Sequence, residues 1–228
     1  MAVVAVTGST GAATTSPASP GLPLAQPSGN LTAPDVVARV VATRQGLNSF
    51  SVPIHFNLVV HKGVSVSAQL DAVRYFQSPD KDMLVMQSMP PMARKFRNIY
   101  TGVGTPETWL AQYDVTFAED QVSNSQSYKL KGVPKGTSSV GISYVLLDVA
   151  SDTFAPTSAH VFYSNGGTVA LQFENEAVNG IYRLPALETI DIAFPDYKVH
   201  AVAHYGAYEI NAPIPESIWQ SSPQPLPT

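Results

Sequence analysis

Alternation of apolar and polar residues is the clearest pattern in this sequence. From Phe50 to Val60 every even-numbered position is apolar, and polar residues or prolines fill most positions between them. Such a period of two predicts a long strand with one buried face. Pro53 has no backbone N–H to donate, which predicts a sheet edge or a bulge at that point. After a turn at Lys62-Gly63, the same even parity continues from Val64 to Ala72 and predicts a second long strand.

Shorter alternating segments fill the rest of the chain. They are separated by residues that tolerate positive φ, such as Asn165-Gly166-Gly167 and Asn179-Gly180, which favour tight hairpins. Sequential strands with short turns predict an antiparallel meander, and therefore a mainly β fold of the α+β class built on one large, curved antiparallel sheet. The further predicted strands are Met83–Met86, Tyr113–Phe117, Ser125–Val133, Val140–Val149, Thr157–Ser164, Thr168–Asn175, Gly180–Phe194 and Tyr197–Ile210.

Only a few segments have helical character. Thr32 is a candidate N-cap, with Asp35 three residues later, and valines recur on one face up to Val41. This pattern predicts a helix of about fourteen residues that ends near Gly46 and packs on the sheet. A short helix is also predicted over Ala93–Tyr100, and Glu107–Tyr113 predicts either another short helix or the approach to a strand.

The two ends of the chain differ in composition from the middle. Residues 1–30 contain no charged side chain and are rich in Ala, Ser, Thr, Pro and Gly, so they cannot bury enough apolar area to offset the entropy of ordering. We therefore expect a disordered tether or signal-peptide remnant over residues 1–31, a folded domain over 32–220 and a disordered tail over 221–228. The segment Val4–Ala13 resembles a dinucleotide-binding turn, but a proline-rich run follows it where that motif needs a helix.

Charge and cysteine content narrow the function classes. The net charge of −4 and the scattered basic residues argue against nucleic acid, which requires clustered Lys and Arg. The chain has no cysteine, which excludes disulfides, thiolate zinc sites and cysteine nucleophiles. The sequence contains no run of about 18 apolar residues, so it predicts no transmembrane helix.

Candidate catalytic chemistry is sparse. His200 and His204 share one face of a predicted strand, but positions four apart on a strand are about 13 Å from each other, so a metal site would need ligands from other strands. There is no Gly-x-Ser-x-Gly elbow, and the paired carboxylates lie in or beside turns or on an exposed strand. We therefore expect a protein that is not an enzyme, with no catalytic residue, no metal and no cofactor.

The order of elements and several turn sequences resemble a known family. A helix and two long strands are followed by Ser78-Pro79-Asp80-Lys81 and then by a short Pro/Met-rich helical segment. The later hairpins carry Tyr128–Lys135, Asn165-Gly166-Gly167-Thr168, Tyr182-Arg183-Leu184-Pro185 and Asp191-Ile192-Ala193-Phe194-Pro195. This arrangement is similar to the LolA-like superfamily of outer-membrane lipoprotein-sorting and lipoprotein-carrier proteins. The chain resembles a divergent bacterial member from about Ala33 to Asn211.

The resemblance implies a half-open β-barrel with a long N-terminal helix and short lid helices over an apolar concave face. It implies an extracytoplasmic protein, in the bacterial periplasm, that is monomeric and binds lipid or an acylated lipoprotein, with transient membrane-protein partners. One position departs from the family pattern. Ser78 stands where the carrier has an arginine that holds the lid, and the nearest arginine, Arg74, has the parity of the apolar positions.

A cluster of methionines suggests where a ligand would bind. Four of the five methionines lie between Met83 and Met92, and Met-rich surfaces adapt to varied ligands. The ligand-binding residues expected from this reading are Phe56, Leu58, Leu70, Phe76, Met83, Met86, Met89, Met92, Phe96 and Tyr100. Two alternatives remain open: a non-catalytic interaction or sensor module on the same fold, and a metal-dependent enzyme that uses His200 or His204.

Overall fold

Antiparallel strands make up most of the computed structural model, which describes residues 31–86, 104–120, 126–136 and 141–220. The chain separates into two units, Met1–Asn30 and Leu31–Thr228, and the second contains every element described below. The strands of its sheet are β1 (Ser49–Lys62), β2 (Val64–Gln77), β3 (Lys81–Met86), β4 (Tyr113–Phe117), β5 (Ser127–Pro134), β6 (Ile142–Ala150), β7 (Pro156–Tyr163), β8 (Thr168–Val178), β9 (Tyr182–Phe194), β10 (Tyr197–Tyr205) and β11 (Glu209–Ile210).

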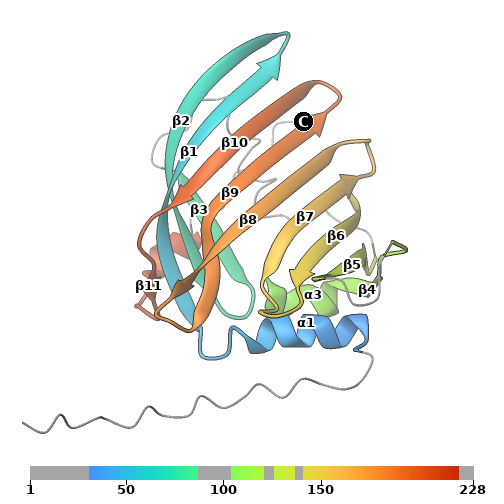
Figure 1. Cartoon of the computed structure of the whole chain (residues 1–228). Coiled ribbons are helices and arrows are strands. Elements are labelled where there is room, and N and C mark those ends of the chain that lie inside the picture. Colours follow the sequence, from blue (N-terminus) through green and yellow to red (C-terminus); the bar gives the residue numbers. More distant parts are fainter. Residues whose placement is uncertain (1–30, 87–103, 121–125, 137–140, 221–228) are drawn as a thin grey trace, which may run out of the picture. The chain divides into compact units, whose positions relative to one another are not determined.

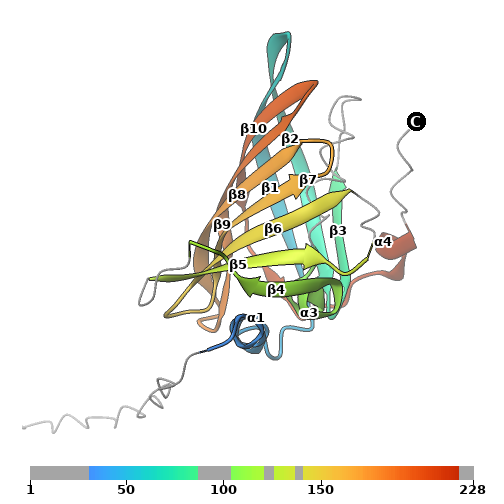
Figure 2. The same cartoon turned by 90° about the vertical axis from the view of Figure 1, so that its right-hand side faces the viewer.

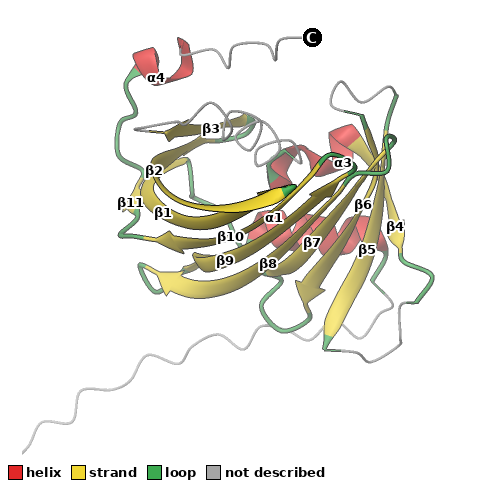
Figure 3. Cartoon of the chain, turned by 90° about the horizontal axis from the view of Figure 1, so that it is seen from above, coloured by secondary structure: helices red, strands yellow, loops and turns green. Residues whose placement is uncertain are grey.

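These strands form a single open sheet. Their order across it is β3-β2-β1-β10-β9-β8-β7-β6-β5-β4, with β11 paired to the beginning of β1, and every pairing is antiparallel. The sheet curves strongly, and its two edge strands, β3 and β4, do not pair with each other (Figure 3). The predicted fold class, a curved antiparallel sheet that forms a half-open barrel, is confirmed.

One predicted strand is divided in the structure. The segment predicted as Tyr197–Ile210 forms β10 and β11, separated by residues 206–208. The break lies opposite Pro53 of β1, whose carbonyl oxygen accepts a hydrogen bond from the Gly206 N–H at 2.8 Å. A Cβ at Gly206 would approach the Pro53 ring to 2.8 Å, so glycine allows the two chains to lie this close. The irregularity signalled by Pro53 therefore appears in the strand beside it.

The N-terminal helix α1 (Ala33–Ala42) begins at the predicted cap but is shorter than predicted. The Thr32 side chain accepts a hydrogen bond from the Asp35 N–H, and the Asp35 carboxylate accepts one from the Thr32 N–H, which completes a capping box. At the other end, the Thr43 hydroxyl donates to the Val40 carbonyl at 2.7 Å, and residues 43–46 form turns. The helix therefore has 10 residues.

Removal of this cap gives a first testable result. We expect Thr32→Ala to lower the free energy of unfolding by about 1 kcal/mol, because an N-terminal amide of α1 loses its acceptor. Urea unfolding followed by circular dichroism measures the change. Thr32→Ser keeps a hydroxyl at the cap and serves as the control. An Ala variant as stable as the Ser variant would show that the cap contributes nothing.

Helices close one end of the half-barrel. The short helices η2 (Pro106–Thr108) and α3 (Trp109–Gln112) contact α1, and α1 also contacts the edge strand β4. Figure 2 shows α1 across this end of the sheet and the β1–β2 hairpin at the other end. The segment Glu107–Tyr113, which predicted a helix or a strand approach, thus contains helical turns that lead into β4.

One more helix lies near the C-terminal end of the described residues. This helix, α4 (Glu216–Gln220), contacts the edge strand β3, as Figure 2 shows. Figure 1 labels the strands together with α1 and α3. The helix predicted over Ala93–Tyr100 lies outside the described residues. Within the described part of the chain, no helix is both long and apolar enough to cross a lipid bilayer.

Candidate functional site

The concave face of the sheet forms the apolar centre of this unit. The even-numbered residues of β1 from Phe50 to Leu58 are at most 5% exposed, whereas the odd-numbered residues between them are on the other face. Phe56, which is fully buried, faces Leu70 on β2 and Ala203 on β10 in the strand register. The inward residues of the other strands extend this surface, with Leu84, Leu130, Val145, Leu147, Val161, Val169, Leu171, Leu184, Ile190, Ile192 and Val199 also buried.

A cavity of about 140 Å³ lies within this concave face, toward the end that the helices close. Residues from both sides of the half-barrel line it, since Phe50 and Phe76 come from β1 and β2 while Leu171 and Phe173 come from β8. A cavity of this size holds a group about as large as benzene. The cavity, which is partly open, therefore accommodates by its own volume only part of a long hydrocarbon chain.

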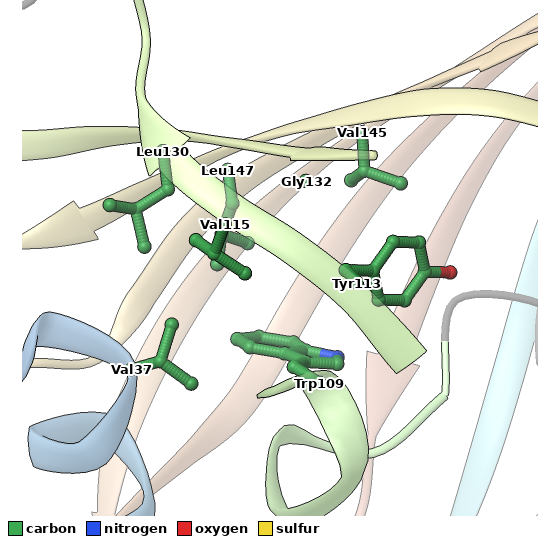
Figure 4. A pocket seen from close by; sticks show the side chains of 8 residues that line it. All are labelled: Val37, Trp109, Tyr113, Val115, Leu130, Gly132, Val145 and Leu147. Atoms are coloured by element: carbon green, nitrogen blue, oxygen red, sulfur yellow. The ribbon is translucent and has the colours of Figure 1, made fainter. Parts of the chain in front are cut away.

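A second, smaller cavity of about 30 Å³ lies where α1 and α3 meet β4, β5 and β6. Figure 4 shows the Trp109 indole beneath β4, with Val37 of α1 on one side and the Tyr113 ring on the other. The indole nitrogen and the Tyr113 hydroxyl point to the same side, away from Val37. Trp109 borders both cavities, and its buried Nε1–H has no hydrogen-bond acceptor among the described residues.

Charged side chains line part of the larger cavity. The Arg74 guanidinium donates two hydrogen bonds to the Asp82 carboxylate, at 3.0 and 2.6 Å, across β2 and β3. Arg44 donates through Nε to Glu107 at 2.6 Å, and its guanidinium lies 4.8 Å from the centre of the Phe76 ring. Each arginine is thus paired with a carboxylate that balances its charge, and both arginines still line the cavity.

A carboxylate and the tyrosine Tyr208 complete the polar part of the cavity, and a second tyrosine outside its lining bonds to the carboxylate. Glu188 is only 2% exposed, and the Tyr205 hydroxyl donates a hydrogen bond to it at 2.6 Å. Tyr208 donates to the Pro185 carbonyl at 2.7 Å, and burial raises the pKa of its phenol above the ordinary value. The cavity therefore joins an apolar wall to a polar region, which suits a ligand with a long apolar part and a small polar group.

The structure places four of the expected binding residues on the concave face. These are Phe56, Leu58, Leu70 and Phe76, all buried. Met86 faces the same side because it pairs with Ala72, and it packs against the core. Met83 pairs with Tyr75 and has the opposite parity, so it lies on the convex side of β3. Met89, Met92, Phe96 and Tyr100 lie outside the described residues.

The histidines lie on the convex face. His200 contacts Asp191 on β9, and His55 contacts Asp71 on β2, each through Nδ1 at 2.7 Å. The register also places His55 directly opposite His204. Among residues 31–86, 104–120, 126–136 and 141–220, no group of three or more His, Cys, Asp or Glu side chains is arranged to hold a metal ion.

Several residues of the cavity wall were absent from the residues expected from the sequence. Arg44, Trp109 and Tyr208 come from segments whose relation to the sheet is set by long-range packing. Glu188 carried a usable signal, because it shares the parity of Leu184 and Ile190 and is a charged residue in an apolar row. A carboxylate at such a position indicates either a buried partner or a polar ligand.

These features define a class of protein: half-open antiparallel barrels, closed at one end by helices, with an apolar concave face. Comparison with solved structures gives the fold a name, since the chain has the fold of the LolA-like superfamily, as the sequence predicted. Identities of 12–13% show a shared fold and nothing finer. No family model matches the sequence, and no curated protein matches it.

Three of the similar structures illustrate the extent of the match. A Vibrio parahaemolyticus domain described as an outer-membrane lipoprotein-sorting protein aligns with a TM-score of 0.55 and 12% identity over 80% of this chain and 94% of its own. A DUF1329 family protein from Desulfovibrio piger aligns with a TM-score of 0.55 and 13% identity, over 80% of this chain and 93% of its own. A LolA superfamily protein from Nitrosomonas europaea aligns with a TM-score of 0.52 and 13% identity, over 82% of this chain and 97% of its own.

Proposed function

We propose that this protein is an extracytoplasmic carrier or binder of lipid or of lipoprotein acyl chains, which it holds against the concave face of the sheet. The observation that carries the proposal is the continuous apolar concave surface with a cavity at its closed end, inside a sheet whose edges do not pair. Hydrocarbon gains about 0.8 kcal/mol for each CH₂ group removed from water, so such a surface favours acyl chains.

The proposed cargo follows from the apolar concave face, which extends beyond the cavity, and from the polar groups of the cavity wall. The acyl chain lies along Phe56, Leu58 and Leu70, and the polar group faces the region of Arg74 and Glu188. Because the cavity is small and the residues of the concave face beyond it are buried, uptake of a long chain requires side chains to move apart along that face. We propose a bacterial periplasmic location, a monomeric state and no catalytic activity; the fold shared with a domain described as an outer-membrane lipoprotein-sorting protein supports the location.

The small volume of the cavity favours one other function, a protein-interaction or sensor module on the same fold. In that case the concave core is a structural interior, and binding occurs on an outer surface. The two functions differ in one observable property, because only the carrier retains lipid through purification.

Native mass spectrometry of the full chain purified from a bacterial periplasm, with lipid extraction of the same sample, tests the proposal. We expect a bound acyl lipid, and we expect Met86→Asp to lower the lipid-bound fraction by about tenfold, because the carboxylate would lie on the apolar concave face. Met83→Asp is the matched control, because it adds the same charge to the same strand on the convex side.

The outcomes separate the two functions. Lipid that is lost in Met86→Asp and kept in Met83→Asp supports the carrier and locates its binding face. Thermal unfolding of both variants verifies that they remain folded. A wild-type protein that is free of lipid and takes up neither fatty acid nor phospholipid would eliminate the carrier and favour the interaction module.

A further inference from the structure

The turn end of the β1–β2 hairpin exposes an unusual amount of apolar surface. Within residues 59–67, here called the hairpin tip, Val64 is 70% exposed, Val66 41% and Val59 39%. The other large exposed apolar residues in the described chain, Leu110, Val133 and Ile181, come from separate segments. Figures 1 and 2 show that the tip projects beyond the neighbouring β9–β10 hairpin, at the end of the sheet opposite α1.

The exposed valines of the hairpin tip lie mainly on its concave face, and the convex face carries Val59 beside the polar His61, Ser65 and Ser67. Val64 and Val66 have the parity of the concave face, whereas Val59 has the opposite parity and pairs with the exposed His200 of β10. An apolar face with a polar face behind it, at the projecting end of a hairpin, suits shallow insertion at the boundary of a lipid bilayer, where apolar side chains enter the acyl region and polar ones stay at the level of the headgroups.

The concave apolar surface continues without interruption to the hairpin tip. The cross-strand pairs Phe56↔Leu70, Leu58↔Ala68 and Val60↔Val66 follow one another along β1 and β2 on the concave side. Exposure rises along this row, from the buried Phe56 and Leu70 to the exposed Val66. The row forms an apolar path from the proposed binding face to the tip.

The charges of the hairpin match an anionic surface. Residues 56–70 contain no Asp or Glu, although the whole chain carries a net charge of −4. Lys62 lies at the turn, where its aliphatic stem can lie along apolar surface while its ammonium remains at the level of lipid phosphates. The adjoining β9–β10 turn adds Asp196 and Lys198, whose charges offset each other.

We propose that the hairpin tip inserts into the surface of an anionic phospholipid bilayer, and that the apolar row of β1 and β2 passes an acyl chain between the membrane and the concave face. The second half of this statement rests on the proposed function, whereas membrane insertion of the tip does not. Gly63, at the turn, has a φ of +76° and nothing within 4 Å of its Cβ position, so the turn itself is open to lipid.

Vesicle flotation of the full chain tests insertion of the hairpin tip. The probes are vesicles of phosphatidylcholine with and without phosphatidylglycerol, at low ionic strength. We expect the wild type to float with the anionic vesicles and the double variant Val64→Asp/Val66→Asp to bind them at least about tenfold more weakly. Lys62→Gln should weaken binding by about fivefold, because one cationic side chain near the lipid surface is lost.

Ile181→Asp provides a matched control. Ile181 is as exposed as Val64, but it lies in the β8–β9 turn at the opposite end of the sheet. The Ile181→Asp variant should therefore bind vesicles as strongly as the wild type. A wild type that does not float with anionic vesicles, or a double variant that floats as well as the wild type, would overturn the proposal and direct attention to a protein partner.

A transfer assay separates this proposal from the proposed function. The protein is loaded with a fluorescent fatty acid, and transfer to acceptor vesicles is followed. A Val64→Asp/Val66→Asp variant that loads normally and transfers slowly supports the whole proposal. A wild type that binds vesicles but takes up no fatty acid supports tip insertion and eliminates the carrier. Equal transfer by the variant and the wild type would eliminate the apolar path.

Discussion

Phe56→Ala is expected to lower the free energy of unfolding by about 3–5 kcal/mol, because a fully buried ring is lost and a cavity remains. Phe56 lies in the middle of β1, which has neighbours on both sides, and it faces Leu70 and Ala203. Strands β1, β2 and β10 are each hydrogen-bonded to a neighbouring strand on both sides, so they cannot readily move into the cavity that the lost ring leaves. Urea unfolding of the full chain, followed by circular dichroism, measures the loss.

Two further variants show whether the loss comes from the core. Ile181→Ala removes a side chain that is 70% exposed and should change the free energy of unfolding by less than about 0.5 kcal/mol. Phe56→Leu leaves a smaller cavity than Phe56→Ala and should be intermediate. If Phe56→Ala were as stable as Ile181→Ala, the concave face around Phe56 would not be a packed core.

Arg74→Ala is expected to destabilise the fold by about 3 kcal/mol, because it leaves the Asp82 carboxylate buried without its main partner. The Asp82 side chain is only 7% exposed, and Arg74 holds it by two hydrogen bonds. The double variant Arg74→Ala/Asp82→Ala should recover part of this loss, because it removes the buried charge as well.

A double-mutant cycle in urea gives the interaction between the two side chains. Strictly additive effects of the two substitutions would show that Arg74 and Asp82 do not stabilise each other. Lys129→Ala is the control, because Lys129 pairs with Asp120 at an exposed site where water screens the charges, and no measurable change is expected there.

Strand parity was the most informative property of the sequence. In β1 the even positions predicted as apolar are buried from Phe50 to Leu58 and half-buried at Val60, and Arg74, which has this parity on β2, lines the cavity. The reason is geometric, since alternate residues of a strand must point to opposite faces. In β3 the same rule places Met83 and Met86 on opposite faces of the sheet, although both were expected to bind ligand because they lie close together along the chain.

The polar part of the cavity depended on contacts that no local pattern contains. Arg44 follows α1 and Glu107 belongs to η2, yet they form an ion pair across 63 positions of the chain. Tyr208 lies between β10 and β11, where the sequence predicted an uninterrupted strand. Such contacts are fixed by the closure of the half-barrel, so the sequence predicts the apolar wall far better than the polar groups beside it.

The position of β1 in the sheet has a consequence for the order of folding. Strands β4 to β10 pair with their neighbours in sequence, so each hairpin closes a short loop. The pairing of β1 with β10 instead joins residues that are about 150 positions apart, and loop-closure entropy opposes such long-range contacts until other structure has formed. During synthesis, which starts at the N-terminus, β1 to β3 can therefore pair with one another but cannot join the rest of the sheet until β10 has been made. During this interval the apolar row of β1 and β2 remains exposed to water. This interval makes the N-terminal hairpin the segment most in need of protection from aggregation.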